Sequence, residues 1–227
     1  ALDKAKVDES LKPFVRGIVQ SLLKVLLVVT VLSMVGIEMT SFIAILGAAG
    51  LAIGMALSGT LQNFAGGVMI LLFKPYKIGD VIDAQGYIGK VYEIQIFNTI
   101  LKTPDNKTII IPNGGLATGS MTNYSTEDTR RVDWTFGIGY GDDVDQARDV
   151  MTSLCEQDKR ILADPEVYIK VSALADSSVN FTVRAWVNAE DYWDVFFDMN
   201  ESIYKTFNQQ GINIPFPQMD VHVHKND

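Results

Sequence analysis

Two histidines close to the C-terminus, His222 and His224, have a spacing that could gather a metal ion. Residues two apart in an extended strand point to the same side. Copies of this segment brought together could therefore surround a divalent cation with imidazoles. No cysteine accompanies them at a ligand spacing, because the single cysteine of the chain is Cys155. We expect no metal site and no cofactor.

Three acids, Asp142, Asp143 and Asp145, are the other candidate cation ligands. They stand where an amphipathic helix is expected to begin, and the helix dipole favours carboxylates at that end. We interpret them as helix-start residues. Cys155 lies on the apolar face of the same helix with no histidine or base near it in sequence, which favours a buried structural thiol. Without a nucleophile–base pair or a phosphate-binding loop, we predict no enzymatic activity.

The charges of the chain are unevenly distributed. Residues 1–75 contain six Lys/Arg and four Asp/Glu, a net of +2, whereas residues 76–227 contain thirteen and twenty-three, a net of −10; together they give −8. The acidic total argues against a protein that binds nucleic acid by neutralising phosphates. Hydrophobic residues make up 48% of the chain, at the top of the globular range. The two halves are expected to lie in different solvents.

Two apolar runs in the first half predict a membrane hairpin. Met39 to Phe73 has 35 residues without a charge, and Gly17 to Ile37 is interrupted by one charge, Lys24. Runs of 18 or more apolar residues are typical of membrane spans. Lys24 can extend its ammonium to the interface or face a neighbouring helix. The alternative is a pair of buried helices in a soluble core.

The basic residues around the hairpin predict its orientation. The turn Glu38–Ser41 has no Lys or Arg. The basic residues lie on the outer flanks of the hairpin: Lys4, Lys6, Lys12, Arg16, Lys74 and Lys77. By the positive-inside rule both flanks, and with them the C-terminal half, are expected to be cytoplasmic. The second run would extend about 52 Å as one helix, against a hydrocarbon core of about 30 Å. The run is therefore expected to break, tilt or lie along the membrane surface, and Ser58-Gly59-Thr60 is the natural place for a break.

Small residues line one side of the second run. On a helical wheel they form two adjacent edges, one of glycine and one of alanine: Gly47, Gly50, Gly54, Ala44, Ala48 and Ala52. Leu51 and Met55 are the two large residues between these edges. In a ring of copies the edges would pack against each other and these two side chains would form apolar collars at the axis. Ordinary helix–helix packing would use the same stripe.

The chain resembles the bacterial small-conductance mechanosensitive channel (MscS) family over roughly residues 12–223. The segments that carry the resemblance follow one another in order: residues 43–75, Gly79-Asp80, Gly89-Lys90-Val91, Ile111-Pro112-Asn113-Gly114 and residues 215–221. The resemblance implies a homoheptamer in the inner membrane that opens under tension and releases ions and osmolytes on hypo-osmotic shock. It implies constriction at Leu51 and Met55 and a kink at Gly59. Met55 and Ser58 depart from the leucine and glutamine common there.

The second half predicts two small domains and a tail. Short β-rich segments with turns at Gln85-Gly86, Gly89 and Asp105-Asn106 favour a small barrel, and the resemblance implies an Sm-like β domain. Residues 130–214 show a β-α-β-β-α-β order, which indicates a ferredoxin-like sandwich. Its second helix is expected to bury Phe196, Met199, Ile203 and Phe207. Residues 219–224 resemble a strand of an oligomeric C-terminal barrel.

The expected fold class is therefore membrane α plus α+β. Residues 1–76 are transmembrane helices including the pore helix, residues 77–127 the Sm-like β domain, residues 128–214 the ferredoxin-like domain, and residues 215–227 the barrel strand. The function expected is a mechanosensitive ion channel whose partners are its own copies, membrane lipid and permeating solutes. A secondary transporter and a membrane-anchored scaffold are the alternatives. A transporter needs polar midplane ligands, which this run does not supply.

Overall fold

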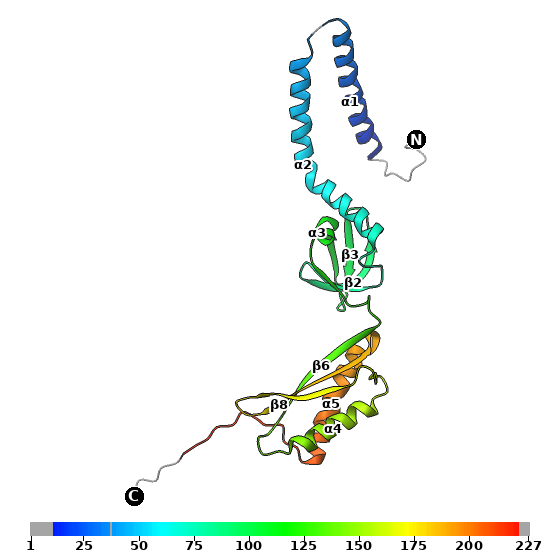
Figure 1. Ribbon diagram of the computed structural model, residues 1–227. Coiled ribbons are helices and arrows are strands. Elements are labelled where there is room, and N and C mark those ends of the chain that lie inside the picture. Colours follow the sequence, from blue (N-terminus) through cyan, green and yellow to red (C-terminus); the bar gives the residue numbers. More distant parts are fainter. Residues whose placement is uncertain (1–10, 37, 223–227) are drawn as a thin grey trace. The chain divides into compact units, whose positions relative to one another are not determined.

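The computed structural model describes residues 11–36 and 38–222 and forms two compact units, one up to Ala65 and the other from Gly66 onward. The first unit is a helical hairpin of α1 (Leu11–Met34) and most of α2 (Thr40–Phe73), coloured blue to cyan in Figure 1. Both helices are long and apolar enough to cross a membrane, and the most apolar stretch of each is not buried within the described chain. The predicted hairpin is confirmed.

The second helix has no break. The chain stays helical through Ser58, Gly59 and Thr60, so the predicted interruption of the run does not occur. A continuous helix still permits a bend, because glycine and serine weaken the helix locally. The kink at Gly59 therefore stays a prediction.

A bent five-stranded antiparallel sheet with one short helix, here called the β domain, follows α2. Its strands pair in the order β4-β3-β2-β1-β5. Their bounds, with those of the helix, are β1 (Val81–Ala84), β2 (Tyr87–Ile94), β3 (Asn98–Lys102), β4 (Thr108–Pro112), α3 (Asn113–Thr118) and β5 (Met121–Asn123). The predicted turns at Gln85-Gly86 and Asp105-Asn106 are confirmed, and Gln85, Gly86 and Asn106 have positive φ.

The predicted turn at Gly89 is wrong. Gly89 lies inside β2 and pairs with Ile82 of β1. A Cβ at this position would lie 3.0 Å from the Lys102 carbonyl oxygen and 3.1 Å from Leu101 Cβ. Close approach of the neighbouring strand, rather than a change of chain direction, favours glycine here.

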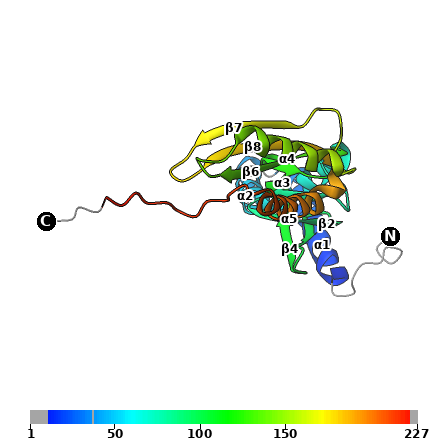
Figure 2. The same cartoon turned by 90° about the horizontal axis from the view of Figure 1, so that it is seen from below.

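A three-stranded antiparallel sheet with two helices forms the next part, here called the α/β domain. Its elements are β6 (Thr129–Ile138), α4 (Val144–Gln157), β7 (Tyr168–Leu174), β8 (Val179–Asn188), the short 3-10 turn η2 (Ala189–Asp191) and α5 (Tyr192–Gln210). The strands lie side by side in the order β6-β8-β7 (Figure 2). Alternate residues of β6 and β8 are buried, as expected for a sheet with one covered face.

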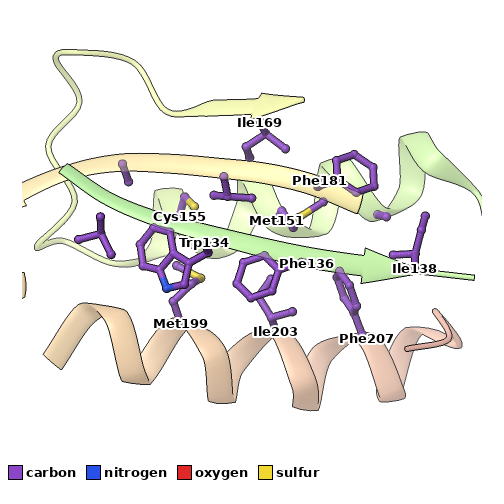
Figure 3. Packing of buried hydrophobic residues seen from close by; sticks show 14 of the residues in the cluster. Trp134, Phe136, Ile138, Met151, Cys155, Ile169, Phe181, Met199, Ile203 and Phe207 are labelled. Carbon is purple, nitrogen blue, oxygen red and sulfur yellow. The ribbon is translucent and has the colours of Figure 1, made fainter. Parts of the chain in front are cut away.

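The core of the α/β domain lies between the sheet and its helices. Side chains of α5 meet those of β6 in Figure 3: Met199, Ile203, Phe207, Trp134, Phe136 and Ile138. Met199, Ile203 and Phe207 are buried as predicted, while Phe196 is only partly buried and Val195 completes the buried face. Gly211 ends α5 with φ 75°, the left-handed conformation that glycine adopts without strain.

The last strand of the predicted sandwich is not formed. Residues 211–222 have no regular secondary structure, and the Gly139 N–H, just after β6, donates to the Asn213 carbonyl oxygen at 3.0 Å. The predicted barrel strand at residues 219–224 is likewise not a strand over 219–222, and its last two residues lie outside the described part. A strand needs a partner for its backbone groups, and the predicted partners are other copies of the chain.

Candidate pore helix and its junction with the β domain

The predicted pore face of α2 is exposed along its length. Leu51 and Met55 are each 65% exposed. All six small residues beside them are exposed as well: Ala44, Gly47, Ala48, Gly50, Ala52 and Gly54. A Cβ added at any of the three glycines would meet no atom within 4 Å outside its own helix backbone. Nothing in the described chain explains why glycine stands there.

The opposite, bulky side of α2 is exposed too. Phe42, Ile53 and Leu57 are at least half exposed. A helix that is apolar on all sides is normally buried in a large core or in a membrane. Because neither the glycines nor the bulky residues are covered within the chain, both sides require surroundings other than water.

The two helices of the hairpin leave an apolar groove between them. It has a volume of about 690 Å³ and is lined mostly from α1, by Pro13, Gly17, Ile18, Ser21, Leu22 and Val25, with Leu46 from α2. The apolar lining and the wide opening suit acyl chains rather than a polar ligand.

The C-terminal end of α2 is packed into the β domain. Gly66, Gly67 and Ile70 are buried. A Cβ on Gly66 would lie 2.6 Å from the Asn113 carbonyl oxygen, and one on Gly67 would lie 2.3 Å from the Ile96 carbonyl oxygen. Real Cβ atoms do not come so close, so only glycine lets this end of the helix lie directly on the β-domain backbone.

A buried polar network holds the β-domain side of this junction. Thr99 Oγ1 donates to Asn113 Oδ1 at 2.8 Å, and Tyr76 Oη lies 2.8 Å from Thr99 Oγ1. The Asn113 amide donates to the carbonyl oxygens of Gln95 (2.8 Å) and Ile96 (3.1 Å). Thr99 and Asn113 have no exposed surface. Every polar atom of the Asn113 side chain is thus satisfied next to the two glycines of α2.

Burial raises the pKa of the Tyr76 phenol, and the hydrogen bond with Thr99 partly offsets this rise. The phenol is therefore protonated at neutral pH and can donate to Thr99. Sequence reasoning did not single out Tyr76, Thr99 or the Gly66-Gly67 pair. The signals were weak, because the three network residues come from distant segments and share no periodicity.

The other candidate residues have structural roles. Asp143 caps α4, accepting from Asp145 N (2.8 Å) and Gln146 N (3.2 Å), which confirms the helix-start interpretation for it. Asp142 Oδ2 accepts from Gly139 N and Asn213 N and so joins two loops instead. Cys155 is buried as predicted, and desolvation raises the pKa of its thiol to about 11.

The structure brings together no metal-ligand cluster of three His, Cys, Asp or Glu residues among those it describes. His222 is exposed, and His224 lies outside the described residues. Their pairing across copies stays untested.

Three protein-family models match consecutive parts of the chain. They are "Mechanosensitive ion channel, transmembrane helices 2/3" over residues 21–58, "Mechanosensitive ion channel, beta-domain" over residues 59–126 and "Mechanosensitive ion channel MscS, C-terminal" over residues 132–214. Together they cover the hairpin, the β domain and the α/β domain.

Individual proteins that are similar to the chain have the same family name. A small-conductance mechanosensitive channel of Edwardsiella ictaluri is 46% identical over 78% of this chain and 62% of its own length. An uncharacterized MscS family protein of Buchnera aphidicola (subsp. Baizongia pistaciae) is 36% identical over 97% of this chain and 78% of its own length. The closed-state crystal structure of Helicobacter pylori MscS has a TM-score of 0.90 at 30% identity, covering 98% of this chain and 88% of that one. The chain thus spans less than two thirds of the Edwardsiella protein.

Proposed function

Because the chain belongs to the MscS family of mechanosensitive channels, we propose that it forms a bacterial inner-membrane channel that opens under membrane tension. Ions and small osmolytes would pass through it on hypo-osmotic shock. The observation that carries the proposal is the exposed stripe of α2, in which Leu51 and Met55 are flanked by glycines that no other part of the described chain approaches. The protein acts without cofactor or catalysis.

The pore arises from packing between copies. Small residues allow helix backbones to approach closely in lipid. The Gly edge of one copy receives the Ala edge of the next, a head-to-tail contact that closes into a ring, which we expect to be a homoheptamer. Leu51 and Met55 are four residues apart, so their side chains form two collars about 6 Å apart along the axis. A narrow apolar constriction empties of water and blocks ions.

Tension acts on the difference in area between the closed and open ring. If the open ring occupies more membrane area, tension shifts the population toward it. Acyl chains contact α1 and the groove beside Gly17 and Leu22, so the hairpin follows the lipid. Tilting of α2 withdraws Leu51 and Met55 from the axis and the pore fills with water.

The junction at Gly66 and Gly67 gives this movement a fixed end. Both glycines rest on the β-domain backbone, and the Asn113 network keeps that backbone in place. Tilting of the rest of α2 is therefore concentrated N-terminal to the junction, toward Ser58 and Gly59. The β and α/β domains lie in the cytoplasm, and the net charge of −10 over residues 76–227 enriches cations near the pore mouth.

Release of solute from liposomes tests the proposal. Protein reconstituted into vesicles loaded with a self-quenched dye should release it when the outside solution is diluted, in proportion to the dilution step. Matched vesicles without protein measure leakage by rupture. Equal release from both would contradict the proposal and favour a membrane-anchored scaffold.

A further inference from the structure

The α/β domain has one sheet face that no helix of its own covers. α4 and α5 pack against the face formed by Val132, Trp134, Val183 and their neighbours. Among the alternate residues, the side chains of Arg131, Asp133, Arg184 and Tyr168 are 42–47% exposed. We call this surface the open sheet face, defined by Arg131, Asp133, Tyr168, Lys170 and Arg184.

The open sheet face has more positive than negative charge. Asp133, Arg184 and Tyr168 lie opposite one another across the three strands. The Asp133 carboxylate is already occupied by Arg131, whose Nε and Nη2 donate to its two oxygens at 2.6 and 2.9 Å. The face has three basic residues, Arg131, Lys170 and Arg184, and one acid, Asp133, so its net charge is +2.

Arg184 is the under-paired group at the centre of this face. Its Nε is buried and has no hydrogen-bond partner among the described residues, and the nearest carboxylate oxygen, Asp133 Oδ2, is 3.7 Å away. The guanidinium lies 5.5 Å from the Tyr168 ring centroid. A buried donor without a hydrogen-bond partner costs free energy. The Arg184 side chain is 42% exposed and its ion pair with Asp133 is long, so its guanidinium can donate to a second acid supplied by another molecule.

A second surface of the same domain has the complementary chemistry. Trp193, Phe197 and Tyr204 are 57%, 59% and 63% exposed on α5, and the rings of Trp193 and Phe197 stack at 5.7 Å. Asp194 is exposed between them and has no ion-pair partner in the described structure, whereas Glu201 pairs with Lys205. We call these four residues, Trp193, Asp194, Phe197 and Tyr204, the α5 outer face.

We propose that the α5 outer face of one copy packs on the open sheet face of the next, with Asp194 pairing with the neighbour's Arg184. An unpaired acid among aromatic rings would meet an under-paired arginine beside aromatic Tyr168, and each surface would be covered by the other. The two surfaces differ, so the contact is head-to-tail and can continue around a ring. The inference rests on the self-assembly in the proposed function and adds the cytoplasmic contact that the α2 stripe leaves undefined.

Charge reversal in the full-length protein in detergent tests the pairing. Asp194→Arg and Arg184→Asp should each raise the protein concentration needed for half-assembly about 30-fold or more, since an unpaired interfacial charge speeds dissociation. The Asp194→Arg/Arg184→Asp double variant should recover most of this loss. Asp149→Arg, an exposed acid on α4, is the matched control and should assemble normally. Light scattering measures the mass. If the double variant is no better than the single ones, or the single ones assemble normally, the inference is wrong.

Disulfide cross-linking gives a second test that tolerates poorly folding charge variants. In a Cys155→Ala background, Asp194→Cys with Arg184→Cys should give a ladder of linked copies beyond the dimer on oxidation, and each cysteine alone should give none. If the double-cysteine variant assembles into a ring of wild-type size but gives no ladder, this contact is refuted while the proposed channel stands. A wild-type protein that remains a single chain would refute both.

Discussion

Thr99 Oγ1 donates a 2.8 Å hydrogen bond to Asn113 Oδ1, and neither residue has exposed surface. The bond joins β3 to the start of α3, directly beneath the glycines where α2 meets the β domain. Since the Thr99 proton points to Asn113, the Tyr76 hydroxyl must be the donor in its contact with Thr99. The end of α2 therefore rests on a fully satisfied polar network.

Removing the Thr99 hydroxyl should loosen this support. Thr99→Val keeps the shape but leaves Asn113 Oδ1 and the Tyr76 hydroxyl without partners, at about 1–3 kcal/mol for each buried group. Hydrogen exchange of the full chain should show lost protection in β3 and β4. Thr108→Val, at an exposed threonine of β4, is the control and should stay within about 0.5 kcal/mol of the parent. Unchanged exchange in Thr99→Val would mean that the network contributes nothing.

Alanine substitutions should distinguish two kinds of glycine in α2. Gly67→Ala places a methyl group 2.3 Å from the Ile96 oxygen, so the helix end must move away and the β domain should lose stability by about 1–3 kcal/mol. Gly54→Ala meets nothing within the chain and should leave the protomer fold unchanged or more stable. Its effect should appear in assembly instead. Hydrogen exchange and light scattering measure the two effects, and equal unfolding of both variants would contradict the distinction.

Periodicity predicted the elements whose stability comes from one local pattern. The charge-free run predicted α2, and three-and-four spacing predicted that Met199, Ile203 and Phe207 are buried. The turn predicted at Gly89 was wrong because glycine is favoured there by close contact with Lys102, which lies on another strand. The Asn113 network joins residues with no shared period, so only the folded chain reveals it. The barrel strand expected at residues 219–224 would depend on partners outside the single chain. The roles of Leu51 and Met55 stay predictions for the same reason.

The ion pairs of Arg160 should make the α/β domain sensitive to acid. Arg160 donates to Asp158 Oδ1 at 2.9 Å and Oδ2 at 2.7 Å, and to Asp198 at 2.9 Å. These bonds lower the pKa of Asp158 below its ordinary 3.8. A carboxyl whose pKa is lower in the folded than in the unfolded state stabilises the fold at pH values above its unfolded-state pKa. This stabilisation is lost as the pH falls through its folded-state pKa.

Asp158→Asn should therefore reduce the free energy of unfolding by about 1 kcal/mol at pH 7 and by less below pH ~4. Asp149→Asn, at an exposed acid of α4, should show neither effect. Denaturant unfolding at both pH values measures the difference. An equal loss for Asp158→Asn at pH 7 and in acid would assign the effect to packing rather than to charge.

The thiol of Cys155 should be unreactive in the folded protein. It is 2% exposed with a pKa of about 11, so few molecules carry a thiolate at pH 8. Maleimide labelling should be at least about 100-fold slower than for an exposed cysteine. Ser153→Cys with Cys155→Ala provides that exposed comparison on the same helix. Equal rates would show that the α4 core opens readily.

A polar residue in the predicted gate should ease opening. Met55→Asn makes one collar wettable, so the closed pore loses part of its barrier to water and opens at lower tension. Ile53→Asn, a matched change on the bulky side of α2, should leave the collar apolar and shift the threshold less. Patch recording of both variants provides the comparison. An unchanged threshold in Met55→Asn would remove Met55 from the gate.

Patch recording of the wild-type protein in liposomes under graded suction is the decisive test of whether this protein is a tension-gated channel. We expect discrete current steps whose open probability rises with tension, without added ligand, and which are absent from protein-free patches. Silence up to the tension that ruptures the membrane, from protein whose ring assembly has been verified, would contradict it.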